Sequence, residues 1–135
     1  MELSPQERTQ LCQAAKKAAQ LAYAPYSKFR VGAAVLGKNK IYEGTNVENA
    51  SYGLCLCAER SALAYAISQG EREFRAIAVA CIDAKDPNNI QLMMPCGACR
   101  QWIAELAPNA EIIICGTDHQ SFSLEDLLPM AFRLE

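Results

Sequence analysis

The stretch RAIAVACI, residues 75–82, is a continuous apolar run of the length of one strand. Such a run is typical of a strand that is buried on both faces of a sheet. AEIIIC, residues 110–115, has the same character, and helical patterns precede the two runs at residues 57–69 and 95–106. This β-α-β-α-β order predicts an α/β fold with parallel strands, right-handed crossovers and helices on the faces of the sheet.

The N-terminal third of the chain adds a helix and a hairpin to this unit. Ser4 followed by Glu7 forms a capping-box pattern, which predicts a helix over residues 5–22 with proline at its first position. FRVGAAVL (29–36) and IYEGTNVE (41–48) read as two strands joined by the turn KNK. The order along the chain is therefore a helix, a β-hairpin, an α-β-α-β portion and a short C-terminal helix.

The overall composition excludes several classes of partner. The chain has 135 residues, 51% of them hydrophobic, with a formal charge of -2, which predicts one domain over residues 1–135 with no surface built to bind nucleic acid. MELSPQERTQ (1–10) contains two acids and is not a secretory signal, and no apolar run is long enough to span a membrane. We therefore expect a cytoplasmic protein whose thiols are reduced.

The chain contains an odd number of cysteines, which together with a cytoplasmic setting argues against a disulfide framework. Cys12 lies in a helical pattern, and Cys81 and Cys115 end the two apolar runs, so we expect these three to be small core residues. The remaining cysteines are Cys55, Cys57, Cys96 and Cys99.

Cys96 and Cys99 form a CxxC motif at the start of a predicted helix, a motif that is typical of a redox pair or of half a metal site. The thioredoxin-like order of elements is missing, and there is no second CxxC to close a structural zinc site. Three thiolates with one open position remain, which is the pattern of a catalytic zinc. Cys57 is the favoured third ligand because it also begins a helix, and Cys55 is the alternative. We expect the single histidine, His119, to be a solvated loop residue.

Glu59 lies on the apolar face of the predicted helix 57–69, and that face also carries Ala62, Leu63, Ala66 and Ile67. Burial of a carboxyl group raises its pKa, which suits a group that takes up a proton and returns it. Arg60 could offset the charge of the thiolates by donating hydrogen bonds to sulfur, or it could be an exposed helix residue.

The motifs CAE (57–59) and PCGAC (95–99) resemble those of the zinc-dependent cytidine deaminase family. The resemblance to the small single-domain members extends over PYSKFRVGAAVL, GTNVENASYG, CAERSAL and PCGACRQ, and LLPMAF is similar to their C-terminal segment. It implies a three-layer α-β-α sandwich with a mixed five-stranded sheet. It also implies hydrolysis of cytidine and 2'-deoxycytidine to uridine and 2'-deoxyuridine, with release of ammonia.

The resemblance assigns a role to each matching residue. It implies one Zn²⁺ per subunit on Cys57, Cys96 and Cys99, and Glu59 as the proton shuttle. The role of Arg60 as a partner of the thiolates is predicted from the charge of three thiolates on zinc and not from the resemblance. The resemblance places the substrate against Phe29, Asn46, Glu48 and Ala58, with Phe132 supplied by a neighbouring subunit of a homotetramer. Independently, Asn46 and Glu48 face the same side of an extended segment, where they could hold a diol and disfavour a phosphate.

Two alternatives remain open. One is a zinc deaminase of another cytosine-bearing compound such as blasticidin S, or of nucleic acid. NVENAS (46–51) and the acidic composition weigh against these. The other is a non-catalytic zinc protein in which Cys55 or Cys81 closes a four-sulfur shell, and this alternative leaves Glu59 without a role.

Overall fold

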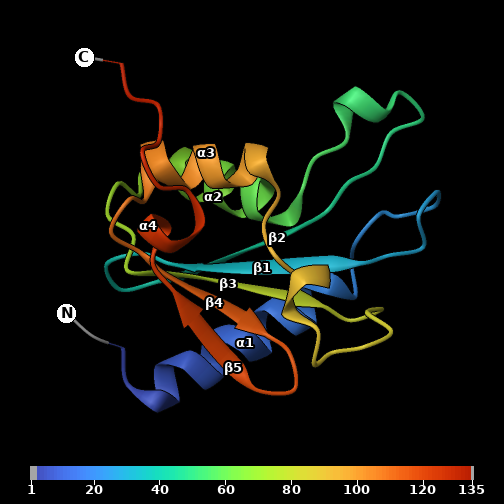
Figure 1. Cartoon of the computed structure of the whole chain (residues 1–135), viewed down its shortest axis with the longest axis horizontal. Helices are drawn as coiled ribbons and strands as arrows, with labels where there is room; N and C mark the ends of the chain where they lie inside the picture. The colour runs from blue at the N-terminus through green and yellow to red at the C-terminus, as the bar shows by residue number, and fades with distance from the viewer. Residues whose placement is uncertain (1–2, 135) are drawn as a thin grey trace.

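A computed structural model describes residues 3–134 of the chain (Figure 1). Helix α1 (Pro5–Ala19) begins where the sequence predicts, because the Ser4 hydroxyl accepts a hydrogen bond from the Glu7 amide while the Glu7 carboxylate accepts one from the Ser4 amide. It ends three residues before the predicted Ala22, since the chain turns over residues 20–22.

Five strands form one mixed sheet in the order β2-β1-β3-β4-β5, which confirms the expected sheet. Strand β1 is antiparallel to both of its neighbours, β3 and β4 are parallel, and β5 is antiparallel to β4. The strands are β1 (Val31–Leu36), β2 (Ile41–Thr45), β3 (Ala76–Cys81), β4 (Glu111–Cys115) and β5 (His119–Phe122).

Two features of this sheet differ from the sequence-based prediction. Strands β2 and β3 run in the same direction, but β1 lies between them, so only β3 and β4 form an adjacent parallel pair. His119, expected in a loop, begins the edge strand β5, and its side chain is exposed as expected. The sequence HQSF (119–122) is too polar to be recognised as a strand, since β5 gains its order from pairing with the buried strand β4.

Helices cover both faces of the sheet, which confirms the three-layer α-β-α sandwich (Figure 1). Helix α1 packs on one face, and α2 (Ala58–Ser68), α3 (Gly97–Leu106) and α4 (Leu124–Leu127) lie on the other. Alternate residues of β1 enter the two cores, with Ala34 and Leu36 facing α1 and Ala33 and Val35 facing α2. Glycine permits the close contact with α1, because a Cβ at Gly32 would lie 1.9 Å from a backbone oxygen of that helix.

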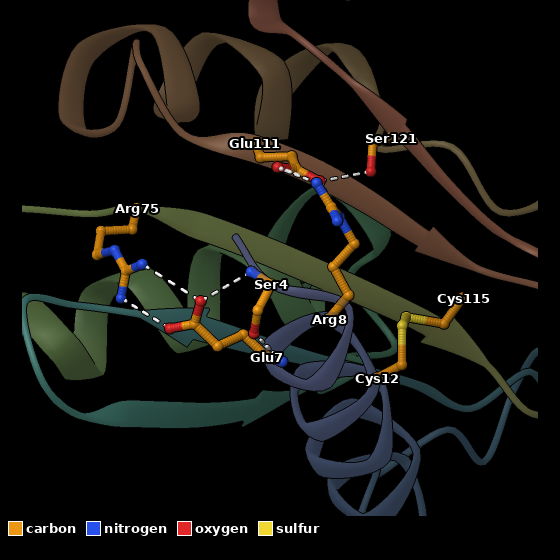
Figure 2. Close-up of polar contacts among 8 residues, drawn as sticks. All are labelled: Ser4, Glu7, Arg8, Cys12, Arg75, Glu111, Cys115 and Ser121. Atoms are coloured by element: carbon orange, nitrogen blue, oxygen red, sulfur yellow. Dashed lines mark hydrogen bonds and ion pairs between the residues drawn. A yellow bond between two sulfur atoms is a disulfide. The ribbon is translucent and has the colours of Figure 1, made fainter. Parts of the chain in front are cut away.

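A disulfide joins Cys12 of α1 to Cys115 of β4 (Figure 2). The interpretation of these two residues as unpaired core cysteines was therefore wrong, although both are buried as expected, with 1% and 5% of their surface exposed. The two cysteines are 103 positions apart in the sequence, so no local spacing indicates that they pair. Cys81 remains a free thiol, as predicted.

Two ion pairs also hold α1 against the sheet (Figure 2). Arg8 donates through two nitrogens to the Glu111 carboxylate, with Nε 2.6 Å from Oε2, and Arg75 binds Glu7 at 3.0 Å. The Ser121 hydroxyl of β5 also donates to Glu111. Helix α1 is thus attached to β4 by a covalent bond and by an ion pair.

Removing the disulfide should lower stability without altering the site on the opposite face of the sheet. A disulfide that closes a loop of this length restricts the unfolded chain, so we expect Cys12→Ala/Cys115→Ala to reduce the free energy of unfolding by about 2–5 kcal/mol. Urea unfolding monitored by circular dichroism measures this change. A phosphine reductant should destabilise the wild type similarly and leave the double variant unaffected, and equal stability of the two proteins would contradict the prediction.

Candidate active site

Three cysteines converge where α2 and α3 begin. Cys57 is the N-cap of α2, Cys96 is the N-cap of α3, and Cys99 lies in the first turn of α3. The sulfur of Cys96 is 3.7 Å from that of Cys57 and 3.6 Å from that of Cys99, and all three lie within 4.8 Å of one another. Across residues 3–134, this is the one cluster of three or more side chains with metal-ligating atoms.

The alternative ligand Cys55 lies outside this cluster. Its sulfur accepts a hydrogen bond from the amide of Asn49 at 3.3 Å and donates to the carbonyl of the same residue, so it closes the loop before α2. Cys81 is outside the cluster as well. The part of the chain that the structure describes therefore offers three clustered sulfurs and no fourth to close a structural zinc site.

The spacing and the charge of the three thiols suit a zinc ion. A tetrahedral ion with Zn–S bonds of about 2.3 Å separates its sulfurs by roughly 3.8 Å, close to the distances in this cluster. Two helix N-termini direct their partial positive charge at the sulfurs and favour thiolates. The donors therefore fit zinc, with Cys57, Cys96 and Cys99 as its ligands.

The pKa values of Cys57 and Cys99 are shifted in opposite directions. Hydrogen bonding from Cys99, and then from Arg60 and Cys96, lowers the pKa of Cys57 to about 5 against the opposing effect of its burial. The same bond to Cys57, together with burial and nearby negative charge, raises the pKa of Cys99. Cys57 is thus the thiolate of the pair and Cys99 holds the proton, which binding of a metal would displace.

Arg60 contacts the cluster as the sequence predicts. Its Nη2 is 3.4 Å from the sulfur of Cys57, and this bond raises the pKa of Arg60, so the guanidinium is a fixed cation. Its Nε is buried and has no hydrogen-bond partner within residues 3–134. The arginine is therefore directed toward the sulfurs instead of toward solvent.

Glu59 is buried next to the thiols, with 4% of its surface exposed. This burial, reinforced by the charge of Cys57, raises the pKa of Glu59 to about 7, although its own backbone amide and Arg60 act in the other direction. Its apolar neighbours on α2 are Ala58, Ala62, Leu63 and Ala66. Glu59 can therefore exchange a proton near neutral pH.

A cavity of about 210 Å³ opens beside Glu59 and the thiols. It brings together most of the residues predicted for the site: Phe29, Asn46, Glu48, Cys57, Ala58, Glu59 and Cys96. Phe132 does not line it and lies in the C-terminal tail with 70% of its surface exposed. Its predicted place in a neighbouring subunit's site stays a prediction.

The apolar wall of this cavity was not predicted from the sequence. Val79 and Cys81 of β3 line it, together with Met93 and Met94 of the loop before α3. The alternation of β3 could have indicated the first two, because residues two apart point to the same face. The two methionines follow no comparable pattern.

Asn46 and Glu48 line the cavity, but both also bind residues 26–31, which lead into β1 and include its first residue. The Asn46 amide accepts from the amide of Val31 at 2.8 Å and donates to the carbonyl of Phe29 at 2.9 Å. The Glu48 carboxylate accepts from two backbone amides and from the hydroxyl of Ser27. These hydrogen bonds, which the sequence did not reveal, lower the pKa of Glu48 and keep it ionised.

None of the helices formed by residues 3–134 combines the length and the apolar character needed to cross a lipid bilayer.

Comparison with known proteins gives a consistent result. A family model described as the cytidine and deoxycytidylate deaminase zinc-binding region matches residues 5–116. The chain is 47% identical over 133 residues to a cytidine deaminase of Halalkalibacterium halodurans, with 96% of each protein covered. It is 44% identical over 134 residues to a probable cytidine deaminase of Dictyostelium discoideum, with 96% of this chain and 87% of that protein covered.

A solved structure agrees in fold as well as in sequence. The crystal structure of cytidine deaminase from Burkholderia pseudomallei matches with a TM-score of 0.82 and 48% identity, covering 92% of this chain and 98% of the other. The family model includes all three clustered cysteines. The chain therefore belongs to the cytidine and deoxycytidylate deaminase family.

Proposed function

We propose that this protein is a zinc-dependent cytidine deaminase that hydrolyses cytidine and 2'-deoxycytidine to uridine and 2'-deoxyuridine and releases ammonia. The observation that carries the proposal is the placement of the buried carboxyl of Glu59 beside three converging thiols, in a cavity open to a small molecule. Relatives that match nearly the whole chain are named cytidine deaminases. We further propose that residues 1–135 act as one domain.

Cys57, Cys96 and Cys99 would hold the zinc ion. When bound, zinc lowers the pKa of a water molecule in its open position, which supplies a nucleophile at neutral pH. Arg60 draws electron density from Cys57 through its hydrogen bond and so offsets the excess negative charge of three thiolates.

Glu59 moves the protons of the reaction in this proposal. It accepts a proton from the attacking water and delivers it to N3 of the cytosine ring, while the oxygen of that water bonds to C4. It then carries the second proton of the water to the departing amine, and the C4–N4 bond breaks to release ammonia. Water is consumed, the 4-amino group is replaced by oxygen, and Glu59 returns to its starting state.

Phe29, Asn46, Glu48 and Ala58 are assigned to substrate binding. Phe29 provides an aromatic surface for the base, and Ala58 lies between the Cys57 and Glu59 positions on the cavity wall. Asn46 and Glu48 retain hydrogen-bonding capacity beyond their backbone contacts, because each carboxylate oxygen accepts more than one bond and the amide nitrogen carries two hydrogens. The charge of Glu48 favours a nucleoside over its phosphate.

The tail after α4 supports a proposal about assembly. Met130, Phe132 and Leu134 expose 98%, 70% and 86% of their surface, which is a large apolar exposure for one short segment. We propose a homotetramer in which Phe132 reaches the cavity of a neighbouring subunit. We propose the cytoplasm as the setting, because zinc binding requires the three ligand thiols to remain reduced. The expectation that all thiols are reduced does not hold for Cys12 and Cys115, which form a disulfide.

A comparison of four substrates tests the activity. Zinc-loaded protein should release ammonia from cytidine and 2'-deoxycytidine much faster than from cytosine or blasticidin S, because the latter two lack the ribose that Asn46 and Glu48 would hold. Turnover is followed by ammonia release and by the ultraviolet change on deamination. Turnover of blasticidin S alone would favour the other deaminase class, and zinc-loaded protein that is inactive on all four would favour a structural role.

A further inference from the structure

The segment that carries Phe29 into the cavity has a strained backbone. Lys28, the residue before Phe29, has a φ of 61°, in the left-handed region that residues with a side chain rarely adopt. Such a conformation persists only where surrounding contacts hold it, and it occurs often at functional sites. The contacts that hold residues 27–31 therefore determine where the Phe29 ring lies.

Side chains of the segment that follows β2 hold residues 26–31 from one side. Glu48 accepts from the amides of Tyr26 and Ser27, and Asn46 binds the carbonyl of Phe29 and the amide of Val31. The Ser27 hydroxyl accepts from the amide of Phe29 at 3.0 Å. The amide of Arg30, the residue after Phe29, is bound by a different side chain.

Asp83 binds that amide from the other side. Asp83 Oδ2 accepts a hydrogen bond from the backbone nitrogen of Arg30 at 2.8 Å. The guanidinium of Arg30 donates two more, from Nε to Oδ2 and from Nη2 to Oδ1, each at 2.9 Å. Asp83 follows β3 and begins the loop that brings Met93, Met94 and Cys96 to the cavity. The Arg30–Asp83 pair therefore joins the wall that carries Phe29 to the wall that leads to the thiols.

We propose that Asp83, acting through Arg30, is a positioning residue that sets Phe29 against the base of the bound nucleoside. The proposal rests on the proposed function, since it assigns to Phe29 a contact with substrate. Arg30 and Asp83 side chains are 42% and 25% exposed, and ion pairs with such exposure contribute little to stability. One of the three hydrogen bonds to the carboxylate comes from the backbone amide of Arg30, so the pair also holds the main chain next to Phe29. The same contacts hold the pKa of Asp83 at about 2, so the pair stays ionised under assay conditions.

Asp83→Ala tests the inference in zinc-loaded protein with cytidine. We expect KM to rise about tenfold while kcat changes less than about threefold, because the loss falls on binding of the base and leaves Glu59 and the thiols in place. Asp83→Asn keeps an acceptor for the Arg30 amide and should recover part of the loss. The zinc content should remain that of the wild type.

Glu111→Ala is the matched control, because Glu111 binds Arg8 through the same two guanidinium nitrogens on the opposite face of the sheet. It should leave KM unchanged even if it lowers the thermal stability. A rise in KM common to both variants, or an unchanged KM in Asp83→Ala, would show that the Arg30–Asp83 pair is only structural. Loss of zinc from Asp83→Ala would also overturn the proposal, since the effect would then act through Cys96.

A double variant shows whether Asp83 acts through Phe29. Phe29→Ala should raise KM by itself, and adding Asp83→Ala to it should have little further effect, because the ring to be positioned is gone. Independent, multiplicative effects of the two substitutions would contradict the inference. If Phe29→Ala leaves KM unchanged, the assignment of Phe29 to substrate binding fails; if the wild type does not deaminate cytidine, the proposed function itself fails.

Discussion

Glu59→Ala should remove nearly all deaminase activity while leaving the bound zinc and the fold intact. We expect turnover to fall by about 10²–10⁴-fold or more, because the variant has no group that can transfer a proton between water and the base. Folding should not suffer, since Glu59 is a buried carboxyl whose burial disfavours its charged form. Steady-state kinetics on cytidine, with zinc measured on the same sample, gives both quantities.

Glu59→Gln is the control for shape. Glutamine fills nearly the same volume but cannot take up a proton at neutral pH, so this variant should be almost as inactive as Glu59→Ala. If either variant turned over cytidine at close to the wild-type rate, Glu59 would not be the proton shuttle. Inactivity accompanied by loss of zinc would instead indicate that Glu59 supports the metal.

Cys57→Ser should release zinc, and with it the activity. Serine is a good N-cap residue, so the start of α2 should survive and the effect should fall on the metal alone. A hydroxyl is a far weaker zinc ligand than a thiolate whose pKa is lowered to about 5. We expect the zinc content to fall well below one ion per chain and turnover to fall by at least about 100-fold.

Cys55→Ser is the matched variant, because Cys55 lies two residues away and lines the same cavity but binds the backbone of Asn49. It should retain zinc. The reverse result, with zinc lost from Cys55→Ser and kept in Cys57→Ser, would mean that the metal binds a different set of cysteines. Metal analysis of the two proteins prepared in parallel decides between these outcomes.

The parts of the site predicted correctly from the sequence are those encoded locally. Cys57 and Glu59 lie at the start of one helix, so spacing placed the thiol at the N-cap and the carboxyl on the buried face. For Arg60 the spacing left both a contact with sulfur and an exposed position open, and the structure shows the contact. The CxxC motif of Cys96 and Cys99 was also recognised from local spacing, as a pair of thiols at the start of α3. The apolar runs correctly predicted β3 and β4, because a strand buried on both faces can be recognised from its own sequence without knowledge of the neighbouring strands.

What the sequence did not reveal depends on contacts between distant residues. Strand β5 is polar and is recognisable only when paired with β4, and the partners Cys12 and Cys115 share no local pattern. Asn46 and Glu48 form hydrogen bonds with residues 26–31, and these contacts exist only after the fold brings the two segments together. The sequence therefore gave no sign of them. The same is true of Asp83, which as a residue in a long loop gave no sign of its contact with Arg30.

The bond between Cys12 and Cys115 gives the molecule a closed covalent ring with two short tails. Every residue that lines the cavity, from Phe29 to Cys96, lies inside this ring, as does Cys99. A protease that cuts the exposed loop around Tyr52, whose side chain is 75% exposed, therefore opens the ring without producing two separate fragments. The halves of a cut chain remain joined through α1 and β4, and they stay together unless the sulfurs are reduced.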